Sequence, residues 1–491
     1  MMPFDTEKYL KLQSEKILDR VNLFGDKLYL EFGGKLFDDF HASRVLPGFE
    51  PDTKLKMLLT IKDDVEVLLV INAHDIQNNK IRADLGISYQ ADVLRLIDAY
   101  RTAGLICNTV CITKYEKTKQ VEAFRTKLKN LGITTYLHYH IEGYPHNVSR
   151  ILSKDGFEKN EYIKTTKRIV VVTAPGPGSG KMATCLSQIY NENIRGIKAG
   201  YAKYETFPVW NLPLNHPINL AYEAATADLA DLNMIDPFHL EYYGTKAVNY
   251  NRDVDIFPVL KQMFENIYGK PIYQSPTDMG VNMVGFAIDI EKDTKPACDE
   301  IIRRYLNSLI DLRNGKISQE VVDKIAILMQ KLNISVKDRK CVKTALDKSQ
   351  KSGTVAMGME LTNGQMVDGK ASNLLSAPAA LILNALKKLA GINDELMLIS
   401  PSVIEPINEL KIKYLGNHNP RLHINEVLIA LTISATTNPL AHLAIKQIPN
   451  LKGAQAHSTV ILAESDTQVL KKLRIDLTTE PVAYAHRLYT K

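Results

Sequence analysis

The sequence predicts an α/β protein in which helices flank largely parallel sheets, followed by a more helical α+β domain. Three observations indicate this class. Apolar, strand-like runs alternate with stretches of helical spacing up to about residue 315. Within this part, a strand-like run, a glycine-rich loop and a helix-like stretch follow one another directly at residues 168–190. Beyond residue 315 helical periodicity dominates, and strand-like runs are few.

The alternation is clearest in the first 140 residues. Residues 65–71 form an uninterrupted apolar run, which predicts a buried strand, and residues 91–100 carry apolar side chains at helical spacing. Further strands are predicted at residues 105–112 and 133–137. We interpret residues 113–116 as a capping box that begins the helix between these two strands. That helix is expected to bury Val121, Phe124, Leu128 and Leu131.

The same reasoning extends through the rest of the chain. Residues 168–173 are a β-branched run that predicts a strand, residues 231–235 predict another, and residues 256–267 have helical spacing. Ser335 and Asp338 have the spacing of a capping box. In the C-terminal part, helices are predicted at residues 298–310, 321–332, 377–389 and 424–433, and strands at 353–359 and 459–462.

A chain of 491 residues is long enough for two or three domains. We divide it into an N-terminal α/β region (residues 1–160), an α/β region that carries the glycine-rich loop (residues 161–315), and a mainly helical α+β domain (residues 316–491). The last boundary is placed in the polar stretch around Gly315.

The composition is typical of a soluble globular protein, with 45% hydrophobic and 24% charged residues and a mean hydropathy of −0.14. The net charge of +6 is small for this length and the basic residues are scattered, which argues against a nucleic-acid partner and suits an anionic small molecule. No apolar run approaches the roughly 20 residues needed to cross a membrane. Five widely spaced cysteines and the lack of a signal-like start predict free thiols in a cytoplasmic protein.

The strongest local signal is the glycine-rich segment TAPGPGSGKMAT at residues 173–184. It lies between a predicted strand and a predicted helix, the context in which glycines and free N–H groups at a helix N-terminus bind phosphate. The alternative is a simple turn with its lysine in solvent. The residues expected to bind a phosphorylated small molecule or nucleotide are Gly176, Gly178, Ser179, Gly180, Lys181 and Thr184.

Two positions depart from the nucleoside-triphosphate loop pattern GxxxxGK[ST]. Pro175 stands where the first glycine belongs, and Met182 stands where the magnesium-binding hydroxyl belongs. If a nucleotide binds with magnesium, Thr184 or Ser179 has to hold the ion from a different geometry, or another loop has to hold it.

A second candidate site follows the strand predicted at residues 231–235. A carboxylate at the carboxyl end of a parallel strand, beside a phosphate loop, is well placed to hold magnesium or its water ligands. Asp236 is therefore the candidate metal or base residue, with His239 as acid/base and Glu241 as its partner. The alternative is that Asp236 caps a helix that begins at Pro237.

The densest histidine cluster follows the strand predicted at residues 133–137. His138 and His140 would share one face of a strand, and His146 lies close in sequence, which is ligand-like spacing for zinc. The alternative is that these histidines only form local hydrogen bonds.

Two stretches rich in polar and aromatic residues, 201–213 and 249–253, are further candidates for lining a ligand site, as is the polar loop at residues 275–282. Aromatic rings beside Lys and Arg can stack on a base or sugar while the cations contact phosphate. The alternative is that these residues pack long loops onto their domain.

Several of these motifs together resemble a single family. The stretches at residues 33–39, 174–184, 207–214, 234–241, 249–253 and 275–282 look like the bacterial domain-of-unknown-function 1846 family. The resemblance covers essentially the whole chain and implies a cytoplasmic bacterial protein. It also implies that Pro175 and Met182 belong to the family's pattern, which argues against conventional nucleoside-triphosphate hydrolysis. It supplies no catalytic residues.

Three functions fit these observations. The first is an enzyme that binds a phosphorylated small molecule or a nucleotide with magnesium at the glycine-rich loop, and carries out phosphoryl transfer or ligation. The second is a non-enzymatic nucleotide sensor whose helical C-terminal part forms an oligomer. The third is a metal-dependent hydrolase that uses His138, His140 and His146. A homo-oligomer is expected because closed homo-oligomers are common.

Overall fold

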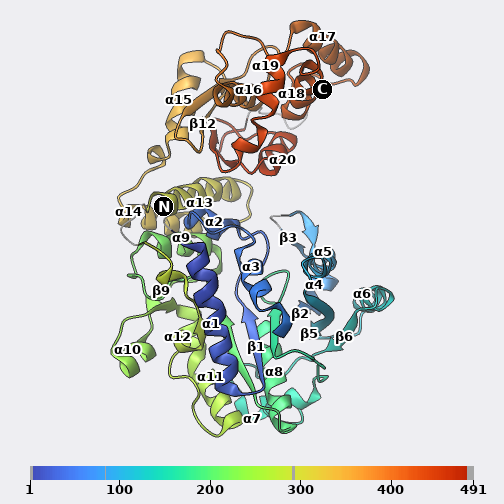
Figure 1. Cartoon of the computed structure of the whole chain (residues 1–491), viewed down its shortest axis with the longest axis vertical. Helices are drawn as coiled ribbons and strands as arrows, with labels where there is room; N and C mark the ends of the chain where they lie inside the picture. Colours follow the sequence, from blue (N-terminus) through green and yellow to red (C-terminus); the bar gives the residue numbers. More distant parts are fainter. Residues whose placement is uncertain (1–3, 83–84, 290–293, 484–491) are drawn as a thin grey trace. The chain divides into compact units, whose positions relative to one another are not determined.

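The computed structural model describes residues 4–82, 85–289 and 294–483. The chain divides into two compact units, Met1–Ala297 and Cys298–Lys491, and each is described by itself. Strands from both α/β regions of the sequence, residues 1–160 and 161–315, share one sheet in the first unit (Figure 1). The more helical character predicted for the C-terminal part is confirmed.

The first unit is built on a seven-stranded sheet. Its strands are β1 (Lys27–Phe32), β2 (Val65–Asn72), β5 (Ile106–Thr113), β6 (Thr134–Leu137), β7 (Ile169–Thr173), β8 (Ala199–Tyr204) and β11 (Gly280–Val281). They lie in the order β11-β8-β1-β7-β2-β5-β6, and every neighbouring pair is parallel, as the alternation predicts. The strands predicted at residues 65–71, 105–112, 133–137 and 168–173 are confirmed as β2, β5, β6 and β7.

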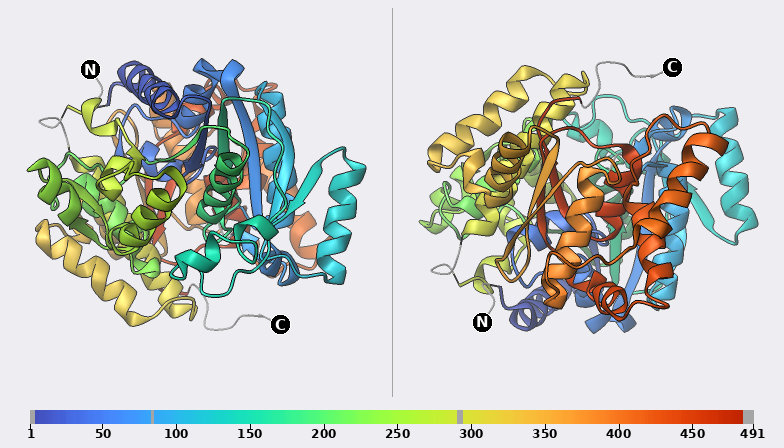
Figure 2. Two further views of the ribbon diagram at one scale, coloured as in Figure 1. Left: turned by 90° about the horizontal axis from the view of Figure 1, so that it is seen from below. Right: turned by 90° about the horizontal axis from the view of Figure 1, so that it is seen from above.

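Helices pack on both faces of this sheet (Figure 2). The α-helices described in this unit are α1 (Thr6–Phe24), α2 (Phe40–Val45), α3 (Thr53–Thr60), α4 (Ala73–Gln77), α5 (Tyr89–Thr102), α6 (Lys119–Asn130), α7 (Val148–Ile151), α8 (Lys181–Ile194), α9 (Pro217–Ala225), α10 (Pro237–Tyr243), α11 (Asn251–Tyr268) and α12 (Pro276–Met279). Tyr204 of β8 faces α1, where its hydroxyl lies 2.5 Å from that of Tyr9. Tyr201 points to the opposite face, where its ring packs on Phe264 of α11. Helix α8 packs on the same face as α11.

The strand order reverses its direction between β2 and β7, which are hydrogen-bonded neighbours. After β2 the chain continues to β5 and β6 at one edge of the sheet, whereas after β7 it continues through α8 to β8 and then β11 at the other edge. In open parallel sheets, ligands bind outside the carboxyl ends of the strands at such a switch point. The loops that follow β2 and β7 therefore mark the edge where a site is expected.

One local prediction in this unit is wrong. Residues 113–116 do not begin a helix, because Thr113 ends β5 and Lys114 has a positive φ of 47°. Helix α6 begins later, after the N-cap Thr118, whose hydroxyl accepts a hydrogen bond from the backbone. Leu131 consequently lies beyond the helix and is 53% exposed instead of buried.

Two small antiparallel sheets lie apart from the main sheet. One joins β3 (Ile81–Arg82) and β4 (Ile87–Ser88), and the other joins β9 (Asn233–Ile235) and β10 (Val248–Tyr250). The strand predicted at residues 231–235 is therefore present as β9, but it does not belong to the parallel sheet. Asp236, which follows β9, does not stand at the carboxyl edge of that sheet.

The second unit has its own four-stranded sheet. Its strands β12 (Ala356–Glu360), β13 (Met366–Lys370), β14 (Gln455–Ser458) and β15 (Asp476–Thr479) lie in the order β13-β12-β14-β15. Strand β12 is antiparallel to both neighbours, and β14 is parallel to β15. The helices are α13 (Lys295–Arg313), which spans the division between the units, α14 (Gln319–Lys331), α15 (Lys340–Ser352), α16 (Ala377–Ala390), α17 (Pro401–Glu409), α18 (Ile424–Ser434), α19 (Pro439–Ile445) and α20 (Glu464–Lys472).

Most predictions for the C-terminal part are confirmed. The four predicted helices are α13, α14, α16 and α18, and the strand predicted at residues 353–359 is β12. The capping box is present as well, since the backbone N–H of Ser335 donates to Asp338 Oδ2 at 2.6 Å. The strand predicted at residues 459–462 is wrong, because β14 ends at Ser458. Strand β14 contains polar residues, such as His457, so the sequence shows no apolar run that would predict it.

All five cysteines are free thiols, as predicted, and four of them are buried. Within the described ranges, no helix combines the length and the apolar character that spanning a membrane would require.

Candidate phosphate site at the carboxyl edge of the sheet

The glycine-rich loop, residues 174–180, connects β7 to α8 at the switch point of the sheet. Asn72, the last residue of β2, donates its side-chain N–H to the carbonyl oxygen of Gly178 at 3.3 Å. Thr113, the last residue of β5, donates its hydroxyl to the carbonyl oxygen of Ser179 at 2.6 Å. The loop is therefore held across the carboxyl ends of two further strands, with its carbonyl groups turned toward the sheet.

The glycines of the loop are required by its shape. Gly178 and Gly180 have positive φ angles of 73° and 92°, and a Cβ on Gly176 would lie 2.1 Å from the Tyr89 hydroxyl oxygen. Within the described part of the chain, no acceptor is hydrogen-bonded to the backbone N–H groups of Gly178, Gly180 and Lys181. These donors stand at the N-terminus of α8, where the helix dipole adds to their attraction for an anion.

A pair of alanine variants tests how tightly the loop is held. Gly180→Ala is expected to lower the free energy of unfolding by about 2 kcal/mol, because of its positive φ and because the new Cβ would lie 3.0 Å from the Thr113 side chain. Gly196→Ala, at the end of α8, is the matched control: its φ of 76° is similar but a Cβ there meets nothing. We expect the control to cost about 1 kcal/mol, measured by urea denaturation. Equal costs would contradict a close contact between the loop and Thr113.

Lys181, the first residue of α8, is the cation nearest to these free N–H groups in sequence. Its side chain is partly buried, and its ammonium makes no hydrogen bond or ion pair with any described residue. Burial lowers the pKa of Lys181, the Glu31 carboxylate opposes this effect, and the Lys203 ammonium adds to it. A buried cation without an ion pair is complementary to an anionic ligand.

Further charges gather around Lys181 from β1, β8 and α11. Glu31 of β1 is the registered neighbour of Lys203 on β8. The Lys203 ammonium forms ion pairs with Asp253, in the first turn of α11, and with Glu205 Oε1 at 2.8 Å. Strands β7, β1 and β8 are parallel neighbours, so their carboxyl ends lie at one edge of the sheet. These side chains therefore lie at the same edge as the glycine-rich loop.

Arg252 adds a third cation to this edge. Its guanidinium lies 3.2 Å from Asp231 Oδ2, and its side chain is 61% exposed. Both Arg252 and Lys203 contribute to lowering the pKa of Lys181, after the larger effect of burial, so the three cations act on the same space. Two long helices, α8 and α11, begin at this edge, which adds two positive helix ends to the three cations.

The two hydroxyls predicted to replace the missing magnesium ligand are turned away from this space. The Ser179 hydroxyl donates to the carbonyl oxygen of Gly176 at 2.8 Å, and the Thr184 hydroxyl donates to that of Gly180 at 3.0 Å. Both side chains are almost completely buried. The structure does not support a magnesium-binding role for Ser179 or Thr184.

The second predicted site has the geometry of a helix cap. Asp236 is fully buried, and its Oδ1 accepts from the backbone N–H of His239 at 3.0 Å. Its Oδ2 accepts from the hydroxyl of Thr277 at 2.7 Å and from the backbone N–H of the same residue at 3.1 Å. His239 Nδ1 lies 3.0 Å from the Ser275 hydroxyl, burial lowers the pKa of His239, and Glu241 is exposed. The catalytic roles assigned to Asp236, His239 and Glu241 stay predictions, while the capping role is what the contacts show.

The histidine cluster does not come together as a metal site. His138 is 3% exposed, its Nε2 lies 3.3 Å from the backbone oxygen of Glu161, and burial lowers its pKa to about 4. His140 and His146 are exposed. Among the residues that the structure describes, no three His, Cys, Asp or Glu side chains are arranged to hold a metal ion. The predicted zinc-type site on these histidines is therefore wrong, because the chain turns away after β6.

Sequence reasoning missed Glu31 and did not single out Glu205. Lys203, Glu205 and Asp253 belong to the stretches 201–213 and 249–253, which were expected to line a ligand site. Glu31 stands inside the apolar strand β1, and Glu205 directly follows β8. A carboxylate in such a position is seldom buried without a partner, so a search for single acidic residues at the ends of apolar strands would have found both.

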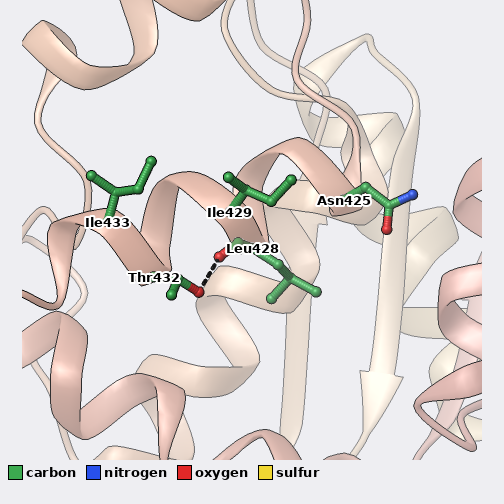
Figure 3. A pocket seen from close by; sticks show the side chains of 5 residues that line it. All are labelled: Asn425, Leu428, Ile429, Thr432 and Ile433. Atoms are coloured by element: carbon green, nitrogen blue, oxygen red, sulfur yellow. Dashed lines mark hydrogen bonds between the residues drawn. The ribbon is translucent and has the colours of Figure 1, made fainter.

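A pocket lies on α18 in the C-terminal unit (Figure 3). This hollow of about 520 Å³ is lined by five residues of that one helix: Asn425, Leu428, Ile429, Thr432 and Ile433. The Thr432 hydroxyl is directed inward to the carbonyl oxygen of Leu428 at 2.8 Å. The hollow offers no charged group to a ligand, so the carboxyl edge of the seven-stranded sheet is the better candidate site.

Comparison with known proteins identifies the family. The family model described as "Domain of unknown function DUF1846, N-terminal" matches residues 2–333, and the model of the C-terminal domain of the same family matches residues 337–489. The chain belongs to the DUF1846 family. This confirms the resemblance that the motifs carry.

Bacterial relatives of this DUF1846 protein are similar along their whole length. The UPF0371 protein of Streptococcus uberis is 54% identical over 491 residues, which cover 100% of this chain and 99% of the relative. The UPF0371 protein of Streptococcus thermophilus is 55% identical over 489 residues, 99% of each chain. The description of the DUF1846 family states no activity, so the function has to be argued from the geometry of the site.

Proposed function

We propose that the protein binds the phosphoryl group of a phosphorylated small molecule, with a nucleotide as the first candidate, at residues 176–181. The observation that carries the proposal is the combination at the start of α8: backbone N–H groups without acceptors beside a partly buried Lys181 ammonium without an ion pair. A phosphate accepts hydrogen bonds from such N–H groups and supplies the missing counter-charge.

The positive groups at the loop favour a phosphate over a carboxylate as the ligand group. Lys203 and Arg252 already have acidic partners, but the Lys181 ammonium has none, and the N-termini of α8 and α11 add positive charge beside it. A phosphate monoester carries close to two negative charges at neutral pH. The glycine-rich loop lies at the switch point of the parallel sheet, which is where ligands bind in open α/β folds.

The reaction class we propose is phosphoryl transfer or ligation on a small metabolite. This reaction class is supported by the buried carboxylates of Glu205 and Asp253 next to the proposed phosphate site, which can orient a second group of the ligand. We assign no residue to magnesium, since Ser179 and Thr184 are buried and donate to backbone carbonyls. The cytoplasmic location, the homo-oligomer and the lack of a nucleic-acid partner stay predictions from the sequence.

A thermal-shift comparison tests the phosphate site. Inorganic phosphate, pyrophosphate, ATP, GTP, coenzyme A and phosphosugars are added to the protein, each with and without magnesium. A ligand that binds only the native state is expected to raise the melting temperature by about 5 °C at a hundredfold excess over its Kd. Lys181→Ala should lose most of this shift, because removing a charge-assisted hydrogen bond weakens binding roughly ten- to hundredfold.

Lys127→Ala is the matched control for this experiment. Lys127 is an exposed lysine on α6, so its loss should leave both the melting temperature and the ligand shift unchanged. Equal ligand shifts in wild-type protein and in Lys181→Ala would sink the proposed function, and would make the glycine-rich loop a structural turn.

A further inference from the structure

The carboxyl end of β8 holds two carboxylates that share a single lysine. The Lys203 ammonium contacts Asp253 and lies 2.8 Å from Glu205 Oε1. The three side chains are 19%, 15% and 9% exposed, in the order Lys203, Asp253 and Glu205. One ammonium cannot neutralise two buried carboxylates, so one of the two acids retains a proton over part of the neutral range.

The geometry assigns this proton to Glu205. Asp253 lies in the first turn of α11, where the positive helix end favours its ionised form. Glu205 has no helix end beside it, and it is the more deeply buried acid. The groups that face it are Lys203 from β8, Asp253 from α11 and the phenol of Tyr250 from β10. Burial raises the pKa of Glu205 to about 7, Lys203 opposes this effect, and Asp253 adds to it.

One atom of Glu205 points to a ligand. Glu205 Oε1 is buried and, beside its ion contact with Lys203, takes part in no hydrogen bond with the described residues. A buried polar atom without a hydrogen bond indicates that a ligand or an ordered water completes the site. On the other side, a Cβ on Gly280 would approach Glu205 Oε2 to 3.0 Å, so glycine leaves room for the carboxyl group.

The acid pair and the phosphate loop belong to one edge of the sheet. Glu31 of β1 lies between them, because it is registered with Lys203 on one side and with Val172 of β7 on the other. The charge of Lys203 also reaches Lys181 of the phosphate loop. A ligand whose phosphoryl group is held by Lys181 would therefore lie close to Lys203, the lysine that contacts Glu205.

We propose that Glu205 exchanges a proton with the ligand bound at the glycine-rich loop, and that this ligand is a phosphorylated small molecule with a hydroxyl or amino group close to its phosphoryl group. The inference rests on the proposed function of the loop. In its ionised form the Glu205 carboxylate takes one proton from the hydroxyl or ammonium group of the ligand, which is left as an alkoxide or a neutral amine, and Glu205 becomes a neutral carboxyl group. The proton returns to the ligand in the reverse step, so charge and protons balance. Lys203 and Asp253 are positioning residues.

Carbon-13 NMR of the full-length protein labelled at the glutamate carboxyl carbon tests this inference. The protein is titrated between pH 4 and pH 9, with and without inorganic phosphate. We expect one glutamate resonance with a midpoint near pH 7, absent from Glu205→Gln and present in the exposed control Glu265→Gln on α11. Bound phosphate should raise this midpoint by about half a pH unit, because a nearby anion disfavours the carboxylate.

Asp253→Asn provides a second variant that keeps Glu205 in place. It should lower the midpoint by about one pH unit, because it removes the like charge that shares Lys203. A glutamate midpoint that stays below about pH 5.5 in the wild-type protein would overturn the inference, since ordinary glutamates titrate near pH 4.3.

The response to phosphate separates the two proposals. If phosphate stabilises the protein through Lys181 but leaves the Glu205 midpoint unchanged, the phosphate site stands and proton exchange with the ligand is wrong. If phosphate, pyrophosphate and the nucleotides do not bind at all, the proposed function itself fails, whatever the midpoint of Glu205.

Discussion

Replacing Lys54 by methionine is expected to lower the free energy of unfolding by about 3 kcal/mol at neutral pH. Lys54 lies on α3 and is 2% exposed, and its ammonium lies 2.7 Å from Asp39 Oδ2. The same ammonium is 3.4 Å from the carbonyl oxygen of Gly33. Removing one partner of a buried ion pair leaves the other charge buried and unpaired, which typically costs about 3–5 kcal/mol. We take the lower end because the Asp39 side chain is 13% exposed.

The pH dependence of this effect follows from the state of Asp39. Burial alone would raise the pKa of Asp39, but the Lys54 ammonium outweighs this effect and the pKa lies below its usual range. The ion pair therefore stabilises the wild-type protein above the pKa of Asp39 in the unfolded chain, and this stabilisation is lost as the pH falls through the lower, folded value. Without Lys54 the pKa of Asp39 rises, so the difference between the variant and wild type should shrink on acidification toward pH 4.

Urea denaturation at pH 7 and pH 4 measures both quantities. Lys56→Met is the matched control on the same helix. Lys56 is 44% exposed and pairs with two exposed acids, so its loss should cost less than about 0.5 kcal/mol. The double variant Lys54→Met with Asp39→Asn should be more stable than Lys54→Met alone, because no charge is left unpaired. A cost for Lys54→Met no larger than that of Lys56→Met would contradict a buried ion pair.

The parallel sheet could be predicted from the sequence because its strands are buried on both faces. Residues 65–71 and 168–173 are continuous apolar runs, and the helices between such runs have clear apolar periodicity. The glycine-rich loop could be predicted as well, since its glycines and its place between strand and helix are local features. These signals depend only on neighbours in the sequence.

The order of the strands could not be predicted in the same way. Strand β7 pairs with β1 and β2, which are more than 90 residues away, and nothing in the sequence of β7 indicates these partners. For this reason residues 231–235 were assigned to the parallel sheet, whereas β9 pairs with β10. Asp236 then received a catalytic interpretation, although the helix cap was the alternative that the same residues offered.

The charged part of the site depends on long-range contacts even more strongly. Glu31 and Glu205 are separated by more than 170 residues, and each is a single acidic residue in its own segment. Only the register of β1 with β8, and the start of α11 beside Lys203, bring the charges together. A pattern search finds the glycine-rich loop, whereas the contacts among the charged groups beside it become visible only in the folded structure.

Replacing Glu205 by glutamine is expected to raise the free energy of unfolding by about 3 kcal/mol at pH 8. The pKa of Glu205 rises from its ordinary value of 4.5 to about 7 in the folded protein, by burial first and then by Asp253, against the effect of Lys203. The fold therefore favours the protonated form of Glu205. Its contribution to stability is fully present below pH 4.5 and is lost as the pH rises through about 7. Each unit of pKa difference corresponds to about 1.4 kcal/mol.

Glutamine resembles the protonated carboxyl group in shape and stays neutral at every pH. Its side-chain N–H group can donate to the Asp253 carboxylate, the acid that helps to raise the pKa of Glu205. Glu205→Gln should therefore match wild type to within about 0.5 kcal/mol at pH 4.5 and exceed it increasingly toward pH 8. Urea denaturation across this pH range measures the difference, with the exposed Glu265→Gln as the control that shows no such trend.

A variant that gains stability by losing an ionisable group indicates that the group is kept at a cost to the fold. Acids with this property concentrate at sites where a proton is transferred, because a pKa near the ambient pH serves both directions of the transfer. If Glu205→Gln instead destabilises the protein equally at pH 4.5 and pH 8, Glu205 acts as an ionised partner of Lys203. The shared lysine would then be a structural ion pair, and Asp253 would be the acid to test for the retained proton.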